Sequence, residues 1–374
     1  MQIEIISIGN ELLWGYTVNT NASYLSHELT QAGYQVARHT VIADDPHSIE
    51  KGLKEALKRA SLVIATGGLG PTLDDLTRKS ADLAIQEEPE NLKNEIGTAL
   101  GAYYCSSDKA LFLLPGVPRE MEKMFQNEAF ARIRKQFPQK QTHFITRCSL
   151  CLLKEVEVDP FLRALKQKHP DLEIGLFPAL GTLQVVFKSQ KPVDEFALQL
   201  QHKFPTFFYG EGKIEEVVHR ELISRQKKLS LAESCTGGQI AAHLTALPDA
   251  SLYFLGSLVA YSDAWKERFL QVSRTTLAKQ GAVSRQTVVE MTEGLFNETD
   301  ADYAIAVSGI AGPGGGTSAK PVGTIYIAIG KRGEKMDAGL LRAPQDRASA
   351  ITLSVNTALG ALWRRIVHNT ATFS

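Results

Sequence analysis

Apolar runs alternate with segments of helical periodicity along the first 140 residues. A buried strand is predicted at 3–8, where most positions are apolar, and further strands are predicted at 34–41 and 62–65. Helical spacing over 21–31 and 47–60 predicts two amphipathic helices, the first capped by Asn19 or Asn21 and stopped at Gly33. Such alternation indicates βαβ units, and we expect an α/β domain with a mostly parallel sheet.

The middle of the chain has a different pattern. A strand is predicted over 142–152, a hairpin over 172–177 and 182–189, and helices over 155–169 and 193–204. The hypothesis is a small α+β unit that acts as a spacer or as a dimer-forming element, since it has no cluster of metal-ligating side chains. It also lacks the basic GxxG loop that a nucleic-acid-binding KH domain uses.

From residue 213 onward, strands and helices alternate again. Strands are predicted at 229–232, 255–262, 303–307 and 322–329, and helices at 214–225, 239–247, 264–270, 285–297 and 347–368. A chain of 374 residues is longer than a single domain with one hydrophobic core usually is. Three domains are therefore predicted, at 1–140, 141–212 and 213–374, all of α/β or α+β class.

Composition narrows the possible partners. The 41 basic and 41 acidic residues balance, so no overall charge favours nucleic acid. No apolar run is long enough to span a bilayer, the N-terminus lacks a signal peptide's basic region, and the four cysteines suit a reducing compartment. We expect a cytoplasmic protein that does not contact membranes. Cys148 and Cys151 have CxxC spacing, but buried strand cysteines are favoured over zinc or redox use because no second pair completes a site.

One stretch with candidate chemistry is Ala232-Glu233-Ser234-Cys235-Thr236-Gly237-Gly238. It joins a short apolar strand to a predicted helix, so a nucleophile and free backbone amides can share one turn. Ser234 is the candidate nucleophile. Cys235 competes with it, although neighbouring side chains on an extended backbone point in opposite directions. The alternative is an ordinary glycine-rich turn.

A second glycine-rich turn, 308–317, also follows a predicted strand, and its small residues suit a phosphate or an oxyanion. No histidine is well placed to activate Ser234, since His243 lies inside the departing helix. Lys266 is the candidate base, because a desolvated lysine can deprotonate a serine hydroxyl, and Tyr261 is a candidate to relay or hold the proton. The alternative for Lys266 is an exposed lysine on a helix.

A third turn, Thr66-Gly67-Gly68-Leu69-Gly70-Pro71-Thr72-Leu73-Asp74-Asp75, follows the strand at 62–65. In parallel sheets ligands bind at the carboxyl ends of strands. Glycine amides can approach a phosphate there, and Asp74 and Asp75 can hold a divalent cation. The alternative is a tight turn with a helix-capping aspartate.

The N-terminal motifs resemble those of the molybdopterin-binding-like domain that opens CinA-family proteins: GNELL (9–13), NTN (19–21), Asp44-Asp45, TGGLGPTLDDLTR (66–78) and LPGVPREM (114–121, with Leu113 before it). The resemblance implies a three-layer α/β domain that hydrolyses ADP-ribose with a divalent metal. The resemblance implies that the metal is held by Asp74 and Asp75. The nucleotide-binding positions it implies are Gly9, Glu11, Asn21, Gly67, Gly68, Gly70 and Thr72. A segment before 94–101 is missing relative to the family and Leu100 replaces a proline, so an inactive or binding-only domain is the alternative.

The C-terminal motifs are similar to the CinA C-terminal domain and its nicotinamide-nucleotide amidase relatives: AESCTGG, Ala260-Tyr261-Ser262 with Lys266, GAVS (281–284), SGIAGPGGGT (308–317) and KPVGT (320–324). The resemblance implies hydrolysis of nicotinamide mononucleotide to nicotinate mononucleotide and ammonia without a cofactor, with Ser234 as nucleophile and Tyr261 and Lys266 as its partners. The substrate-binding positions it implies are Thr236, Gly237, Gly238, Ser308, Gly309, Gly312, Gly314, Gly315 and Arg347, the last for the phosphate.

The C-terminal segment also departs from that family pattern. Asp263-Ala264-Trp265 replaces Asn-Glu-Ala, and Ile351 replaces a second arginine. The unit at 141–212 corresponds in position to the KH-like linker domain of CinA proteins. The sequence thus predicts an amidase, a homodimer with nucleotides as its ligands, and a second activity in the N-terminal domain. The alternative is a nucleotide-binding scaffold linked to competence or the response to DNA damage.

Overall fold

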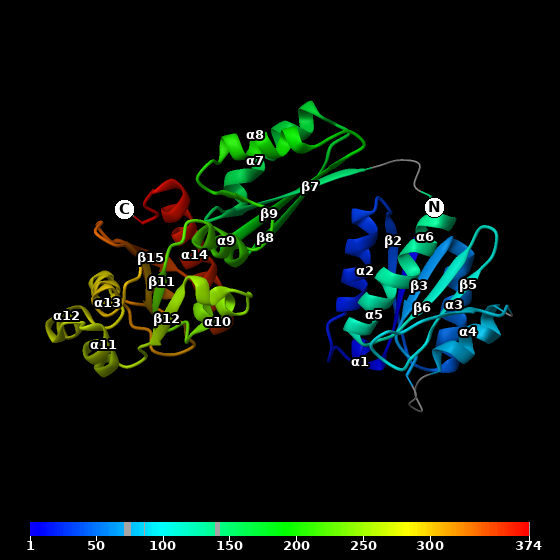
Figure 1. Cartoon of the computed structure of the whole chain (residues 1–374), viewed down its shortest axis with the longest axis horizontal. Coiled ribbons are helices and arrows are strands. Elements are labelled where there is room, and N and C mark those ends of the chain that lie inside the picture. The colour runs from blue at the N-terminus through cyan, green and yellow to red at the C-terminus, as the bar shows by residue number, and fades with distance from the viewer. Residues whose placement is uncertain (71–75, 86, 139–142, 374) are drawn as a thin grey trace. The chain divides into compact units, whose positions relative to one another are not determined.

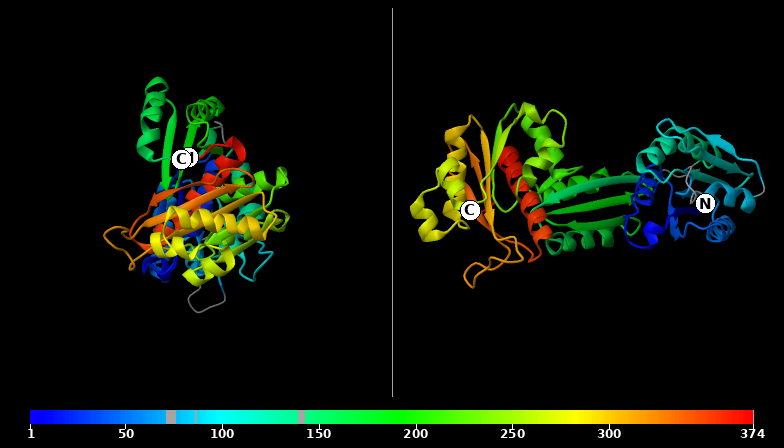
Figure 2. Two further views of the ribbon diagram at one scale, coloured as in Figure 1. Left: turned by 90° about the vertical axis from the view of Figure 1, so that its left-hand side faces the viewer. Right: turned by 90° about the horizontal axis from the view of Figure 1, so that it is seen from below.

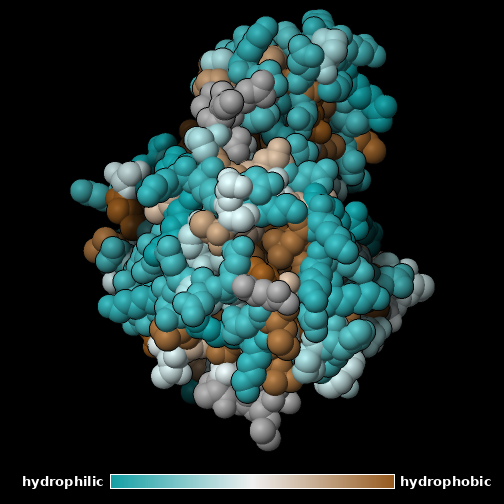
Figure 3. Space-filling view, turned by 90° about the vertical axis from the view of Figure 1, so that its right-hand side faces the viewer, coloured by the Kyte–Doolittle hydropathy of each residue, from teal (hydrophilic) through white to brown (hydrophobic). Residues whose placement is uncertain are grey.

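The computed structural model describes residues 1–70, 76–85, 87–138 and 143–373. Its contacts divide the chain into two units, Met1–His143 and Phe144–Ser374, whose elements are coloured in chain order in Figure 1. No helix in the described ranges is long and apolar enough to cross a membrane. The face drawn in Figure 3 is mostly hydrophilic, with apolar residues in separate small patches.

The first unit is built on a six-stranded sheet with the order β2-β1-β3-β6-β5-β4. Four neighbouring strands are parallel: β2 (Val36–Ile42), β1 (Ile3–Ile8), β3 (Leu62–Thr66) and β6 (Ala110–Leu114). β5 (Gly101–Cys105) and β4 (Glu90–Leu92) continue the sheet in antiparallel pairing. The predicted, mostly parallel sheet is confirmed, and its antiparallel edge is an addition to the prediction.

Helices cover both faces of this sheet, as Figure 1 shows. One face carries α2 (Thr20–Gln31), α5 (Pro118–Met124), a π-helical turn (Phe125–Ala129) and α6 (Phe130–Gln136); the other carries α3 (Pro46–Arg59) and α4 (Thr77–Ile85), while α1 (Asn10–Leu13) is a single turn. Alternation along β1 explains the two cores, because Ile3 and Ile5 pack on the first face and Ile6 and Ile8 on the second. The expected three-layer α/β domain is confirmed. Asn19, not Asn21, caps α2, with its Oδ1 accepting from the Ala22 amide at 3.1 Å.

The second unit begins with an antiparallel sheet in the order β10-β7-β9-β8. Its strands are β10 (Phe208–Gly210), β7 (Phe144–Cys151), β9 (Thr182–Ser189) and β8 (Glu173–Ala179), and its helices are α7 (Glu155–Lys168) and α8 (Asp194–Lys203). Both helices pack on the sheet through a separate apolar cluster. Cys148 and Cys151 are fully buried and unpaired, and burial raises the pKa of each thiol to about 12. The prediction of buried strand cysteines is confirmed.

The rest of the second unit surrounds a five-stranded sheet in the order β12-β11-β13-β14-β15. β12 (Phe254–Val259), β11 (Leu229–Glu233) and β13 (Tyr303–Gly309) are parallel, and β14 (Thr324–Lys331) and β15 (Asp337–Arg342) follow as antiparallel strands. The three parallel strands therefore end at the same edge of the sheet. Residues that follow β11 and β13 are brought together there.

Two layers of helices enclose this sheet, and Figure 2 shows them on opposite sides of the strands. One layer contains α9 (Ile214–Ser224), α10 (Gln239–Thr245), a 3₁₀ turn (Ala250–Leu252) and α14 (Arg347–His368); the other contains α11 (Asp263–Leu270), α12 (Arg274–Gln280) and α13 (Arg285–Glu298). Leu229 and Leu231 on β11 face the first layer, whereas Ala232 faces the second. The turn after β11 therefore lies beside the carboxyl end of β13 and leads directly into α10.

Candidate active site

Ser234 lies at the carboxyl end of β11, where the strand gives way to the turn that leads into α10. Its amide donates to the Val307 carbonyl at 3.0 Å, which fixes the turn against neighbouring β13. The side chain is 7% exposed. Ser234 is therefore held between two parallel strands at the edge of the sheet where ligands commonly bind.

Lys266 comes from α11, which begins after Ser262 and is capped by the Ser262 hydroxyl. Its side chain is only 1% exposed. The Nζ atom lies 3.2 Å from the Ser234 hydroxyl oxygen and donates to the carbonyls of Ala260 at 2.9 Å and Tyr261 at 3.2 Å. The fold thus joins the predicted nucleophile and the predicted base, and the alternative of an exposed helix lysine is wrong.

The surroundings of Lys266 favour its neutral form. Burial lowers the pKa of Lys266, while Asp263 and Cys235 act in the opposite direction. No carboxylate among the described residues forms a salt bridge with its Nζ. A neutral amine has two N–H donors and one lone pair. The two carbonyls can take both donors, which leaves the lone pair for the Ser234 hydroxyl proton, as a general base requires.

Cys235 points into the core instead of toward Lys266. It is 5% exposed and packs in the apolar cluster that contains Ile240 and Leu244. Burial raises the pKa of its thiol to about 12. A thiol in such surroundings is a poor nucleophile because the reactive species is the thiolate.

Tyr261 occupies a place different from the predicted proton relay. Its side chain is 60% exposed, and its hydroxyl accepts a hydrogen bond from Arg347 Nη2 at 3.0 Å. Only its backbone carbonyl contacts Lys266. Arg347, the first residue of α14, also donates from Nη1 to the Gly312 carbonyl at 3.0 Å. The Tyr261 phenol therefore orients the arginine that was predicted to bind phosphate.

Glu233 is a functional candidate that the sequence analysis missed. It is fully buried, and its carboxylate accepts from the amides of Gly238 (3.1 Å), Ile240 (3.1 Å) and Ala241 (3.0 Å) and from the Ser257 hydroxyl (3.1 Å). The carboxylate thus occupies the positive end of α10. Its position directly before a glycine turn and a helix start is the signal that could have identified it.

This contact corrects the role predicted for the glycines of the turn. The Gly238 amide is bound to Glu233, and the Gly237 amide donates to the Ser234 carbonyl at 3.1 Å. Among the described residues, the amides of Cys235 and Thr236 are left without an oxygen acceptor, and the Thr236 hydroxyl is buried without a hydrogen-bond partner. These are the donors of the turn that remain for a bound substrate.

Replacing Glu233 with Gln is expected to lower the free energy of unfolding by about 2 kcal/mol, because an amide N–H₂ would face backbone N–H donors in a buried site. Urea denaturation of the two proteins measures this difference. Glu293→Gln, on the exposed part of α13, is the matched control and should change stability by less than about 0.5 kcal/mol. Equal stability of Glu233→Gln and the wild type would contradict the capping role.

The second glycine-rich turn has residues of two kinds. Ser308 is buried and donates to the Ala282 carbonyl at 2.8 Å. Gly309 and Gly312 are required by packing: a Cβ atom would lie 2.5 Å from Ile325 in the first case and, at a φ of +91° in the second, 2.7 Å from the Gln345 carbonyl. Gly314 and Gly315 are exposed; a Cβ atom would meet nothing within 4 Å at Gly314 and only the Ile310 side chain, at 3.7 Å, at Gly315. Of the predicted glycines here, the last two remain open to a substrate.

The N-terminal candidate site is a pocket of about 110 Å³ at the carboxyl ends of β1 and β3, and Glu11, Asn21 and Gly67 are among its walls. Asn21 Nδ2 donates to the Thr66 hydroxyl at 3.0 Å and to the Gly116 carbonyl at 2.8 Å, while its buried Oδ1 has no partner. Gly67 is required because a Cβ atom would lie 2.1 Å from the Ile8 carbonyl oxygen. The pocket therefore offers the unpartnered Asn21 oxygen as a hydrogen-bond acceptor, beside a glycine whose backbone packs closely against the end of β1.

The structure describes some of the remaining predicted N-terminal site residues and not others. Gly9 lies against the Glu11 carboxylate, and Gly68 lies against the Thr77 hydroxyl. Gly70 is the last described residue before the gap, and Thr72, Asp74 and Asp75 lie outside the described residues. Within the described ranges no three His, Cys, Asp or Glu side chains form a metal-binding group. The described residues alone do not supply the ligand set of the predicted divalent cation, whose predicted ligands Asp74 and Asp75 lie outside them.

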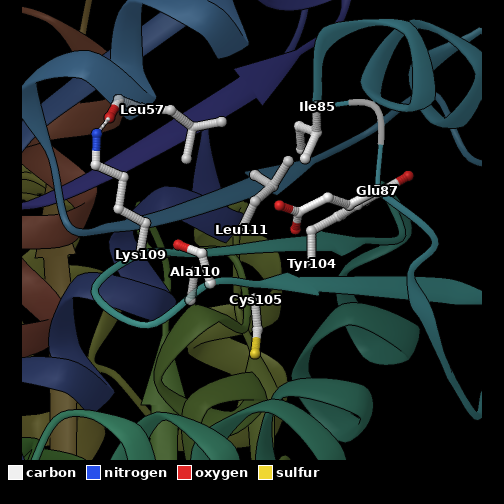
Figure 4. A pocket seen from close by; sticks show the side chains of 9 residues that line it. Leu57, Ile85, Glu87, Tyr104, Cys105, Lys109, Ala110 and Leu111 are labelled. Carbon is white, nitrogen blue, oxygen red and sulfur yellow. Dashed lines mark hydrogen bonds between the residues drawn. The ribbon is translucent and has the colours of Figure 1, made fainter.

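A second hollow of about 110 Å³ in this unit contains none of the predicted residues. Figure 4 shows Leu57, Ile85 and Leu111 along it, with the Lys109 ammonium turned to the Leu57 carbonyl, to which it donates at 2.5 Å. The apolar walls belong to the packing of α3 and α4 on the sheet. Since the Lys109 ammonium already donates to the backbone, we assign no catalytic or binding role to this hollow.

Comparison with known proteins identifies both halves of the chain. Residues 4–135 match the model of a probable molybdopterin binding domain, and residues 211–366 match that of the CinA C-terminal domain. A structure of a competence-damaged protein (CinA) superfamily protein from Klebsiella pneumoniae is 38% identical, covers 42% of this chain and 99% of its own, and has a TM-score of 0.40.

Full-length relatives extend the match across the whole chain. A CinA-like protein from Thermotoga maritima is 36% identical over 87% of this chain and 89% of its own. A competence-damage inducible protein from Halothermothrix orenii is 34% identical over 97% of this chain and 98% of its own. That alignment spans 407 positions, more than the 374 residues here, so the relative contains residues that this chain lacks. This two-part chain, a molybdopterin-binding-like domain followed by a CinA C-terminal domain, belongs to the CinA family.

Proposed function

We propose that the C-terminal domain is an amidohydrolase that converts nicotinamide mononucleotide to nicotinate mononucleotide and ammonia. The observation that carries this proposal is the buried Lys266 amine 3.2 Å from the Ser234 hydroxyl. Serine and lysine in this arrangement form a minimal hydrolase pair, and no metal is needed. The family resemblance supplies the carboxamide nucleotide as substrate.

In the proposed reaction, Ser234 Oγ attacks the carboxamide carbon while Lys266 Nζ takes the hydroxyl proton. Collapse of the tetrahedral intermediate breaks the C–N bond, and Lys266 returns the proton to the leaving nitrogen, which departs as ammonia. Water then attacks the ester carbon and gives a proton to Lys266 Nζ. Collapse of the second tetrahedral intermediate breaks the C–O bond to Ser234, Lys266 returns that proton to Ser234 Oγ, and the product acid leaves and ionises to the carboxylate. The amides of Cys235 and Thr236, which have no oxygen acceptor among the described residues, are candidates to hold the oxyanion.

Arg347 provides the test of the nucleotide as substrate. Arginine binds phosphate through charge-assisted hydrogen bonds, so Arg347→Gln should raise KM for the mononucleotide about 10- to 100-fold. The KM for nicotinamide riboside, which lacks the phosphate, should change little. Ammonia release measured with both substrates checks this, and Arg274→Gln, on α12, is the matched control. An equal rise in KM for both substrates would show that Arg347 does not bind the phosphate.

A second candidate activity belongs to the N-terminal domain. The unpartnered Asn21 oxygen and the close backbone at Gly67 favour binding of a nucleotide in the pocket at the strand ends. We propose ADP-ribose as the ligand and metal-dependent hydrolysis to AMP as the activity. Incubation with ADP-ribose and a series of divalent metals tests it. Binding without AMP formation would leave a nucleotide-binding domain, and no binding would remove both.

The non-enzymatic alternative is a scaffold linked to competence or DNA damage, as the names of relatives suggest for those proteins. Direct contact with nucleic acid would give binding that weakens steeply with salt. The balanced charge of this chain argues against such contact. A salt titration of single- and double-stranded DNA binding separates this alternative from the amidase.

A further inference from the structure

A cavity of about 450 Å³ lies inside the second unit, between the antiparallel sheet and the helices of the C-terminal domain. The sheet contributes Phe177 and Tyr209, while Glu215 comes from α9, His243 from α10 and Asn356 from α14. The Asn356 side-chain amide donates to the Leu180 carbonyl at 2.6 Å, so α14 is tied directly to the hairpin β8–β9. The cavity therefore opens to solvent at its rim, and two of the parts that line it are joined by this hydrogen bond.

Glu215 gives the cavity a carboxylate with unused binding capacity. Its side chain is 13% exposed, and its only charged neighbour at salt-bridge distance among the described residues is His243, 3.6 Å away and charged only when protonated. No hydrogen bond to this carboxylate is found in the described part of the chain. The carboxylate lies in the first turn of α9, whose positive end favours its charge, and a bound cation would add a direct ionic partner that the described residues do not supply.

The remaining walls suit a flat ring. Phe177 is 56% exposed at the rim, and Tyr209 is a buried residue of the wall whose ring also packs edge-on against Trp363. Burial above all raises the pKa of Tyr209, so its hydroxyl stays neutral. Aromatic faces attract organic cations when water is excluded. Among the described residues that line the cavity, Lys213 is the one permanent cation. Its side chain is exposed to water, which screens its charge.

We propose that this cavity is a binding site for a small organic cation with a flat ring, of the pyridinium or aryl-ammonium class. The Glu215 carboxylate pairs with the charge, and Phe177 and Tyr209 contact the ring. The site is separate from Ser234 and Lys266, which do not line it. The proposal does not depend on the amidase activity.

The test is a titration of the full chain with 1-methylpyridinium, followed by ligand-observed NMR at mildly alkaline pH, where the matched ligand pyridine is uncharged. We expect 1-methylpyridinium to bind at least about tenfold more tightly than pyridine. Glu215→Gln should reduce that affinity about tenfold and remove the preference for the charged ligand. Glu221→Gln is the control on the same helix, because Glu221 pairs with Arg225 and does not line the cavity.

Three results would overturn the proposal: no binding of 1-methylpyridinium, equal binding of pyridine, or unchanged binding by Glu215→Gln. Phe177→Leu keeps an apolar side chain but removes the ring, and it should weaken binding several-fold. Because 1-methylpyridinium carries neither a carboxamide nor a phosphate, its binding is read independently of ammonia release. Loss of the amidase proposal would thus leave this measurement intact.

Discussion

Ser234→Ala is expected to reduce ammonia release from nicotinamide mononucleotide at least about 1,000-fold, because removal of a hydrolase nucleophile leaves only binding and oxyanion contacts. The matched variant is Cys235→Ala, at the neighbouring position. It should retain activity within a few-fold, since the Cys235 thiol is buried in the core and has a pKa of about 12. Steady-state assays of both variants, with folding checked by circular dichroism, make the comparison.

The two variants separate three mechanisms. Loss in Ser234→Ala alone supports the serine, and loss in Cys235→Ala alone would transfer the role to the thiol. Full activity in both would mean direct attack by water. Mass spectrometry of the wild type after rapid acid quenching adds a positive signature, because attack by serine leaves a nicotinate mononucleotide ester on the peptide that contains Ser234.

The strands and long helices were predictable because their residues carry a clear period. The helix expected at 347–368 has those bounds in the structure, and the predicted strand at 182–189 is β9. β15 was missed because its outer half alternates between partly buried and exposed positions with no strong apolar run, and α12 because it is short and polar. β5 and β6 were both missed, because an apolar run of five residues does not by itself distinguish a strand from part of a helix.

The sequence predicted which residues belong to the candidate active site, but it did not predict which of their atoms contact one another. Ser234 and Lys266 are 32 residues apart, and only the parallel pairing of β11 with β12 and the turn into α11 bring them together. Whether the Tyr261 hydroxyl or its carbonyl faces Lys266 depends on the chain path after β12. Periodicity does not determine such a path, so the contact of Tyr261 with Arg347 had to come from the structure.

Lys266→Met should lower kcat/KM for the mononucleotide by about 100- to 10,000-fold, the range expected for loss of a general base. Methionine has a similar length and no ionisable group, so it fills the buried site without a proton acceptor. Lys279→Met, at an exposed position of α12, is the matched control and should be fully active. A Lys266→Met variant that folds and retains activity would exclude lysine as the base.

The pH dependence tests the same lysine by a second route. The neutral amine is the active form and burial lowers the pKa of Lys266, so wild-type kcat/KM should rise with pH, with a midpoint below the ordinary lysine value of 10.5. Stability should follow the same sign: between the lowered pKa and 10.5 the unfolded chain binds more protons than the folded one, so the free energy of unfolding increases with pH in that window. Lys266→Met should lose both effects. Measuring kcat/KM and urea denaturation of wild type and variant across that range checks them together, and identical stability profiles would show that Lys266 keeps its ordinary proton in the folded protein.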